Sequence, residues 1–167
     1  MLKKIFLCVS NETIATCPCC GHPLAFRDYR IRVRKVHGGD KSYVLIRRLK
    51  CGHCSKLHNE LPDIFSPYKH YTAEVIEDVV DDIIDSDNTA TENYPCEATM
   101  KRWHDWISRN TLHIEGMLKS IGYRILGFSE RLLKSGVSLL TELRNAGAGW
   151  LGTINRIIYN SGGFVPV

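Results

Sequence analysis

The stretches Cys17-Pro18-Cys19-Cys20-Gly21 and Cys51-Gly52-His53-Cys54 decide the fold of this 167-residue chain. Each stretch contains one C-x2-C pair, and two such pairs supply the four thiolates of a tetrahedral structural zinc site. The glycine in each stretch permits a positive φ, so that backbone amides turn toward the sulfurs. We therefore predict one structural Zn2+ ion bound by Cys17, Cys20, Cys51 and Cys54.

Other assignments of the cysteines stay open at this stage. Cys19 is an alternative ligand in the first pair, and the two pairs are alternatively disulfides or redox pairs. Three neighbouring histidines compete as ligands, although four thiolates leave them no vacancy: His22, His53 and His58. The chain has seven cysteines, and this odd number argues against a complete disulfide framework and for metal in a reducing cytoplasm. We expect Cys8 and Cys96 to be buried apolar side chains.

The segment between the cysteine pairs predicts a β-hairpin. Residues 24–36 alternate Tyr29, Ile31 and Val33 with Arg30, Arg32 and Arg34, and a period of two is typical of a half-buried strand. Residues 37–41 form a glycine-containing turn, and residues 42–50 are the return strand. Residues 57–61 add a short third strand, and residues 1–9, which lack the features of a secretory signal, are expected as a first strand.

The charge is unevenly distributed along the chain. Residues 1–70 carry 13 Lys/Arg against 5 Asp/Glu, residues 71–99 carry 9 acids and no Lys/Arg, and residues 100–167 carry 9 bases against 4 acids. This alternation indicates separate basic and acidic faces, and a basic face is the usual footprint of a polyanionic partner; the alternative is an ordinary solvated surface. No stretch approaches the roughly 18 apolar residues of a membrane-spanning helix, so we expect no membrane partner.

Helical patterns follow a linker at residues 62–71, whose aromatic side chains are expected to pack the ribbon onto the next helix. Thr72 is a good N-cap for an amphipathic helix of about 13 residues. Its predicted outer face is acidic and would repel phosphates: Glu77, Asp78, Asp81, Asp82 and Asp85. A second helix opens at Pro95 and Cys96, with Trp103 and Trp106 on its apolar side. Its exposed side carries Thr99, Lys101, Arg102 and His104.

The two helices are predicted to form a helix-turn-helix unit, with an ordinary amphipathic helix pair as the alternative. Residues 110–160 predict three further helices, with one break at Gly147-Ala148-Gly149. Their apolar stripes either close a small bundle or provide a surface for self-association. Residues 161–167 are expected as a flexible or loosely docked tail.

This order of parts has a counterpart among known proteins. The residues that carry it are the first cysteine stretch, Arg47 to Cys54, His58 to Asp63, Pro67-Tyr68 and Cys96 to Trp103. Over about residues 1–110 the chain resembles the amino-terminal zinc-ribbon and helix-turn-helix region of bacterial transposases. It is more closely similar to an uncharacterised family of Firmicutes and their mobile elements. The resemblance implies DNA binding.

Two departures from that pattern matter. Cys96 stands where such proteins tend to place a serine N-cap. Only 57 residues follow position 110, with acids at Glu115, Glu130 and Glu142, too few for the nuclease domain of a transposase. The resemblance therefore implies DNA binding without cleavage.

The sequence thus predicts an α+β protein: a three-stranded zinc ribbon (1–66), a helix-turn-helix (67–110), C-terminal helices (111–160) and a tail (161–167). We expect a cytoplasmic, non-enzymatic protein that binds double-stranded DNA and no small-molecule substrate. The residues predicted to contact DNA are Arg30, Arg32, Arg34, Arg48, Thr99, Lys101 and Arg102. The alternative is a zinc-ribbon protein–protein adaptor, with self-association through residues 111–160. A basic face that is continuous from the hairpin to the second helix would favour DNA binding.

Overall fold

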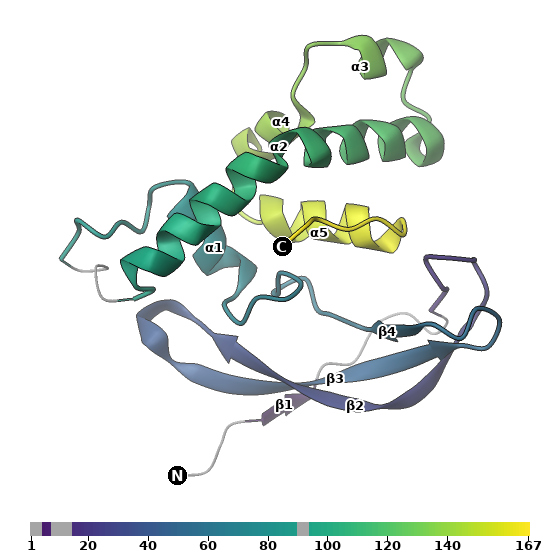
Figure 1. Ribbon diagram of the computed structural model, residues 1–167, viewed down its shortest axis with the longest axis horizontal. Helices are drawn as coiled ribbons and strands as arrows, with labels where there is room; N and C mark the ends of the chain where they lie inside the picture. Colours follow the sequence, from purple (N-terminus) through teal and green to yellow (C-terminus); the bar gives the residue numbers. More distant parts are fainter. Residues whose placement is uncertain (1–4, 8–14, 90–93) are drawn as a thin grey trace.

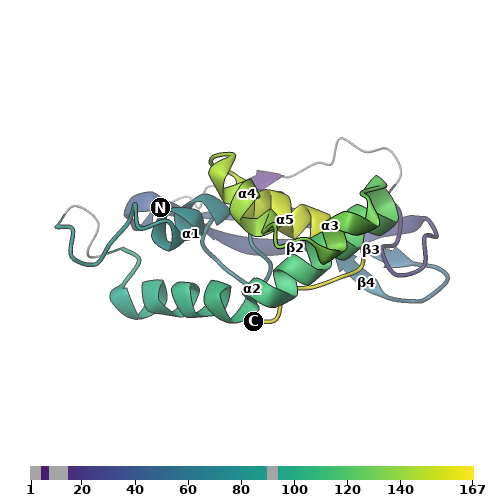
Figure 2. The same ribbon diagram turned by 90° about the horizontal axis from the view of Figure 1, so that it is seen from above.

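The computed structural model describes residues 5–7, 15–89 and 94–167, and it has an α+β fold. A β-sheet forms one layer, and the helices form a second layer over one face of the sheet (Figures 1 and 2). The predicted fold class is confirmed at this level, with an antiparallel sheet followed by helices.

Three antiparallel strands form the body of the sheet. β2 (Leu24–Lys35) and β3 (Lys41–Cys51) make a long hairpin joined by the 3-10 turn η1 (His37–Gly39), and β4 (Leu57–Asn59) pairs with the end of β3. β1 (Ile5–Leu7) pairs in parallel with the middle of β3. The remainder of the predicted first strand lies outside the described residues.

The linker after β4 attaches the sheet to the helical layer. Phe65 is buried against Val44 and Ile46 in a small core of its own. The linker backbone also bonds to the end of β2, where the Lys35 amide donates to the carbonyl of His70 at 2.9 Å. The expected packing of the linker aromatics is correct for Phe65 and for Tyr71, which meets Trp103 edge-on. It is wrong for Tyr68, which is 69% exposed.

Five helices follow: α1 (Ala73–Val80), α2 (Glu97–Leu126), α3 (Glu130–Lys134), α4 (Leu139–Asn145) and α5 (Trp150–Asn160). α1, α2, α4 and α5 share the main hydrophobic core, which contains Trp103, Trp106 and Trp150. Figure 1 shows α5 between α2 and the sheet. The expected small bundle thus forms from apolar faces that come from both halves of the chain.

The helix boundaries differ from the prediction at three places. α2 is one continuous helix of 30 residues, so the boundary expected at residues 110/111 falls in its middle. Where three helices were predicted for residues 110–160, the second half of α2 is followed by α3, α4 and α5. α1 has 8 residues, because the chain leaves the helix at Asp81 and takes a positive φ at Asp82.

The helix-turn-helix arrangement is not confirmed. The connection between α1 and α2 spans residues 81–96, whereas the turn of a helix-turn-helix has about three or four residues. α1 and α2 pack together through the shared core rather than through a short turn. The pair is closer to the alternative, two amphipathic helices that cover a common core.

The predicted acidic outer face of α1 lies partly inside the molecule. Glu77 is buried, and its carboxylate accepts hydrogen bonds from the amides of Gly149 and Leu151 at 2.8 and 2.7 Å. Asp81 accepts from Arg144 and from the Trp150 indole. These acids satisfy the free amides and the positive end of the α5 dipole, which a sequence pattern cannot reveal.

Residues 161–167, expected as a flexible or loosely docked tail, lie along α2. Val165 is buried, and the carbonyl of Pro166 accepts from Trp106 Nε1 at 2.6 Å and from Asn110 Nδ2 at 3.1 Å. Two buried polar groups of α2 need acceptors, and the tail provides one. Within the described residues, no helix has both the length and the apolar character required to cross a membrane.

Candidate metal centre and nucleic-acid interface

The four predicted cysteine ligands meet at one end of the sheet. The sulfurs of Cys17, Cys20, Cys51 and Cys54 all lie within 4.8 Å of one another. Across the two pairs, the Sγ atoms of Cys17 and Cys54 are 3.6 Å apart, and those of Cys20 and Cys51 are 3.5 Å apart. Four thiolates around a tetrahedral zinc ion stand about 3.8 Å from each other, since each Zn–S bond is about 2.3 Å. The quartet therefore fits a metal ion of this kind.

Backbone hydrogen bonds close each cysteine pair into a tight turn. In the first pair the Gly21 amide donates to the carbonyl of Cys17 at 2.8 Å, with Gly21 at a φ of 73°. In the second pair the Ser55 amide donates to the carbonyl of Cys51 at 3.0 Å. β2 begins just after the first turn, and β3 delivers the chain to the second, so the hairpin register sets the distance between the two pairs.

The thiols of the quartet have unequal proton affinities. Burial alone would raise the pKa of Cys17, but the amides of Cys19 and Cys20 donate to its sulfur and lower the pKa to about 6. The amide of His22 would lower the pKa of Cys20, but burial and the neighbouring sulfur of Cys51 raise it to about 12. A bound cation would stabilise the deprotonated form of each thiol. It would therefore convert this mixture of thiolate and thiol into four thiolates.

The alternative ligands lie around this quartet. All six described cysteines are free thiols, so the disulfide alternative has no support here. His58 Nε2 is 3.4 Å from Cys17 Sγ, and the rings of His22 and His53 stack on each other at 4.0 Å. Cys19 is exposed, but its ligand atom lies within 4.8 Å of those of Cys17 and His58, so it remains an alternative ligand. Cys96 is exposed as well, contrary to the expectation of burial, and Cys8 lies outside the described residues.

Two arginines of β2 face the helical layer. Arg30 and Arg32 pair across the hairpin with Ile46 and Val44, whose side chains are buried on that face. Arg32 Nη2 donates to the carbonyl of Lys69 in the linker at 3.1 Å, while its buried Nε makes no hydrogen bond. The hairpin therefore brings Arg32 into contact with the linker on the helical side of the sheet.

The linker continues this positive charge toward α2. Lys69 Nζ lies 4.7 Å above the Trp106 ring. Burial and the nearby charges of Arg102 and Arg109 lower the pKa of Lys69. Burial also lowers the pKa of His70, and so do the charges of Arg32 and Lys35. The cations of the two layers are thus close enough to repel one another.

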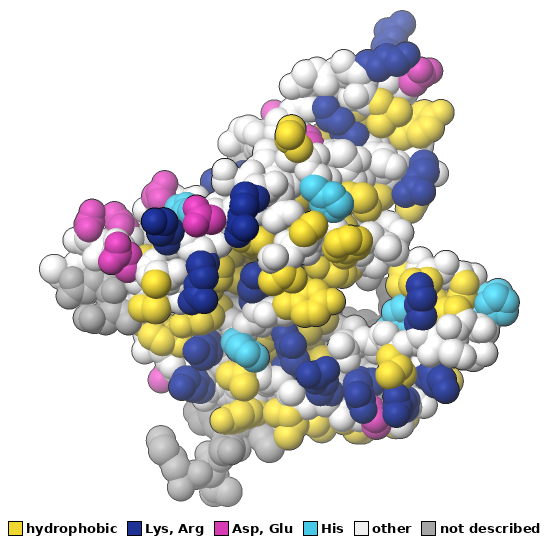
Figure 3. Space-filling view, viewed as in Figure 1, with side chains coloured by type: hydrophobic (Ala, Val, Ile, Leu, Met, Phe, Trp, Pro, Cys, Tyr) yellow, Lys and Arg dark blue, Asp and Glu magenta, His cyan; other side chains and the backbone are white. Residues whose placement is uncertain are grey.

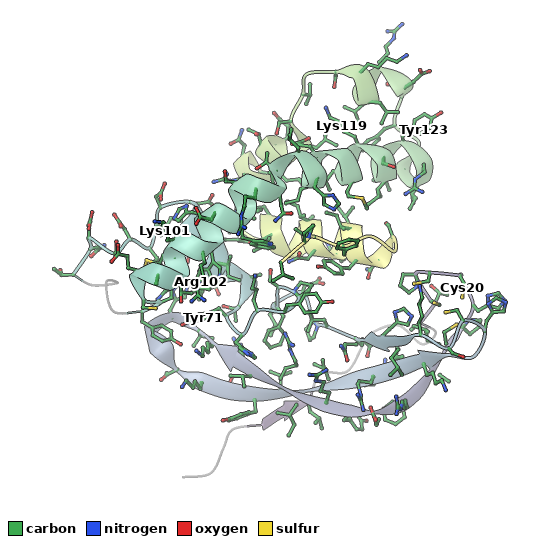
Figure 4. All side chains as sticks on the ribbon, in the orientation of Figure 1. Cys20, Tyr71, Lys101, Arg102, Lys119 and Tyr123 are labelled. Atoms are coloured by element: carbon green, nitrogen blue, oxygen red, sulfur yellow. The ribbon has the colours of Figure 1, made fainter. Side chains whose placement is uncertain are left out.

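These residues form what we call the basic face: Arg30, Arg32, Lys35, Lys69, His70, Arg102 and Arg109. Figure 3 shows Lys and Arg side chains gathered along the sheet and over the first half of α2, with hydrophobic and His side chains between them. In Figure 4, Arg102 extends from α2 on the side of Tyr71 and the sheet. Clustered cations of this kind create a positive potential that attracts a polyanion.

A family model matches residues 17–103, which is more than half of the chain, and its description is "Domain of unknown function (DUF6431)". The chain belongs to this family. The DUF6431 segment begins at the first ligand cysteine and ends at Trp103 in α2. It therefore includes both cysteine pairs, the hairpin and the linker. Comparisons with curated proteins and with solved structures found no match.

Within the DUF6431 segment, the structure separates the predicted DNA contacts. Arg30, Arg32 and Arg102 belong to the basic face, and Lys101 is exposed on α2. Arg48 is paired with Asp28, its Nε donating to Oδ1 at 2.5 Å. The hydroxyl of Thr99 accepts from Arg102 at 3.0 Å, so it positions that arginine.

Arg34 takes a different position from the other β2 arginines. It lines a hollow near the N-terminal ends of α1 and α5, together with Thr72, Glu74 and Arg156. Asp63 and Glu77 line the same hollow, and the buried Nε of Arg34 makes no hydrogen bond. The seven residues predicted to contact DNA thus differ in environment. Arg48 is paired with Asp28, Arg34 lines the hollow, and the other five lie on β2 and α2 outside it.

Four members of the basic face were missed by the sequence reasoning: Lys35, Lys69, His70 and Arg109. Lys69 and His70 lie in the linker, for which the sequence pattern predicts only the packing of aromatic residues. Arg109 is seven residues after Arg102, a spacing that puts both on one face of a helix that continues past residue 110. A prediction that this helix continues past residue 110 would therefore have placed Arg109 on the same face as Arg102.

Proposed function

We propose that this DUF6431 protein is a non-catalytic DNA-binding protein whose ribbon is stabilised by one zinc ion. The observation that carries the proposal is the continuity of the basic face from β2 through the linker to α2. A row of cations across two layers fits a phosphate backbone, because each neutralised phosphate releases condensed counterions. Two of the acids in this region, Glu77 and Asp81, do not oppose this binding, since they are engaged in internal hydrogen bonds.

Zinc is the metal that we propose for the cysteine quartet. Thiolate ligands in a tetrahedral set select zinc over harder cations such as Mg2+. Four thiolates would fill its coordination shell and leave no position for a substrate, which favours a structural over a catalytic role. A cytoplasmic, regulatory or transposase-like role follows as part of the same proposal, since thiols stay reduced in that compartment.

A salt-dependent binding assay tests the proposal. The zinc-loaded full chain is titrated into labelled duplex DNA, and fluorescence anisotropy is followed at two salt concentrations. We expect binding that weakens steeply with salt, and Arg109→Ala should reduce the salt slope by about one. Arg131→Ala, which removes an exposed arginine of α3 outside the basic face, is the matched control and should leave the slope unchanged. Absence of binding to any DNA at low salt would contradict the proposal.

The adaptor alternative is favoured by a separate observation. Apolar side chains are exposed around the end of α2, where Tyr123, Ile125, Leu126 and Phe128 are 41–61% accessible. Clusters of this kind often mark protein contacts. Figure 4 places Tyr123 near α3, far from Arg102. Sedimentation of the free protein would detect self-association through residues 111–160.

A further inference from the structure

Tyr68 stands in an unusual backbone conformation beside the basic face. The Lys69 amide donates to the carbonyl of Ser66 at 3.2 Å, which closes a turn with Pro67 and Tyr68 at its centre. Tyr68 has a φ of 64°. Proline followed by a positive φ is the pattern of a type II turn, in which the second central position normally requires glycine or asparagine. A tyrosine here is strained, and strained residues cluster at functional sites.

The strain at Tyr68 does not serve packing. The side chain is 69% exposed, whereas its linker neighbours Phe65 and Tyr71 pack into the protein. The turn therefore holds an aromatic ring in solvent directly before Lys69 of the basic face.

Phe164 is a second exposed ring held in place by its backbone. Its side chain is 60% accessible, while the next residue, Val165, is buried. His113 Nε2 donates to the Phe164 carbonyl at 2.7 Å, and the two rings lie 5.9 Å apart. The tail is thus fixed on both sides of Phe164, and its ring lies beside that of His113 with most of its surface exposed to solvent.

Tyr159 and Trp106 hold the tail beside the linker. The Val165 amide donates to the Tyr159 hydroxyl at 3.2 Å. On the other side, Trp106 contacts both Lys69 and the carbonyl of Pro166. We call Tyr68 and Phe164 the aromatic shelf, and it borders the basic face at Lys69.

We infer that the basic face takes DNA as a single strand whose unpaired bases stack on the aromatic shelf. This inference rests on the proposed function, namely that the basic face binds DNA. Exposed aromatic rings beside a row of cations are the combination that single-strand binders use, because every base has a face that can stack. In a duplex those base faces are covered by neighbouring base pairs and cannot reach Tyr68. The recessed Arg32 is likewise more accessible to a flexible strand than to a duplex.

The test compares two DNAs and a variant that separates binding from stability. The zinc-loaded full chain is titrated into labelled oligothymidine and into a labelled duplex of equal length at the same salt concentration. Tyr68→Gly removes the ring and also relieves the positive φ, so it should not unfold the turn. We expect the wild type to prefer the single strand and Tyr68→Gly to weaken that binding about tenfold. Duplex affinity and the melting temperature should not fall.

Two further variants act as controls. Tyr68→Phe keeps the stacking ring and should retain single-strand affinity, and Tyr123→Ala removes an exposed tyrosine at the far end of α2 and should have no effect. Phe164→Ala should weaken single-strand binding in the same way as Tyr68→Gly.

The outcomes separate the two proposals. If the duplex binds as tightly as the single strand, or if neither Tyr68→Gly nor Phe164→Ala lowers single-strand affinity, the shelf inference is wrong and DNA binding stands. If neither DNA binds, the proposed function itself fails.

Discussion

Glu77 is the residue whose role differs most from its sequence context. It belongs to an acidic run, yet it is 4% exposed and binds two amides at the start of α5. A buried carboxylate in this position combines two hydrogen bonds with a favourable interaction with the helix dipole.

Glu77→Gln should therefore destabilise the protein. The glutamine amide group would face a backbone N–H, which leaves a buried donor without an acceptor and removes the charge, at a cost of about 1–3 kcal/mol. Urea unfolding followed by circular dichroism measures the change. Asp105→Asn, at an exposed position of α2, is the control and should stay within about 0.5 kcal/mol. Equal effects of the two substitutions would show that Glu77 does not hold α5.

On the proposed function, we expect His70 to make DNA binding dependent on pH. Burial lowers its pKa below the ordinary value of about 6.5, and so do Arg32 and Lys35, which keeps the ring neutral at pH 7. A bound phosphate would offset that repulsion and raise the pKa, so the complex takes up a proton. DNA affinity should thus increase as the pH falls from about 7.5 to below the ordinary histidine pKa of about 6.5.

Anisotropy titrations across this pH range measure the linkage. His70→Asn, which cannot be protonated, should show a flatter pH dependence, while His104→Asn, on the same side of the molecule as α1, should keep the wild-type dependence. An affinity that is constant with pH in the wild type would contradict a phosphate beside His70.

At the scale of elements, we expect the two cysteine turns to depend on one shared metal ion. Each turn is short and is followed by a strand, and the ribbon has only the small core of Val44, Ile46 and Phe65. Small modules with so little apolar burial are usually stabilised by metal.

Cys51→Ser should abolish zinc binding by the cysteine quartet. Serine does not replace a thiolate ligand, so the variant should contain no zinc after purification, against one ion per chain in the wild type. Native mass spectrometry gives the stoichiometry. Cys96→Ser, which alters an exposed thiol outside the quartet, should retain one ion. A Cys51→Ser variant with full zinc content would remove Cys51 from the ligand set.

The elements also show which features the sequence could predict. The hairpin and the quartet were predictable, because period-two alternation and C-x2-C spacing are local signals. The continuity of α2 was missed, since the polar stretch near Asn110 and Thr111 resembles a boundary. In the structure Asn110 is buried and donates to the carbonyls of Trp106 and Pro166. Its partner is 56 residues away in sequence, which no local pattern reveals.

The basic face likewise depends on contacts that a local sequence pattern does not reveal. Arg30 and Arg32 were predicted from their strand, but Arg48 and Arg34 have the same residue type and different environments. Asp28 reaches Arg48 only because the register shifts between Phe26 and Asp28. The charge of a side chain is visible in the sequence, whereas its pairing depends on tertiary contacts.

At the scale of the whole molecule, the family segment is not a complete folding unit. It ends at Trp103, while the core around that residue includes Leu140, Ile154 and Ile158 from later helices. A fragment of residues 17–103 would expose Val75, Ile76 and Trp103.

We therefore expect this fragment to lack cooperative unfolding even when it is loaded with zinc. Thermal melts by circular dichroism and the dispersion of its amide NMR signals would show this, with the full chain as the control. A fragment that melts cooperatively would mean that the ribbon and α1 form an independent domain.

Gly162 links the far end of the helical layer to the first cysteine turn. Its φ is 80°, and a Cβ atom at this position would lie 2.6 Å from the carbonyl oxygen of Pro18. Four residues later, the carbonyl of Pro166 accepts the indole N–H of Trp106. The cysteine turn and this tryptophan are thus joined by one short, tightly packed segment. If the quartet holds zinc as proposed, removal of the metal by a chelator should therefore change the fluorescence of Trp106 before the helices melt.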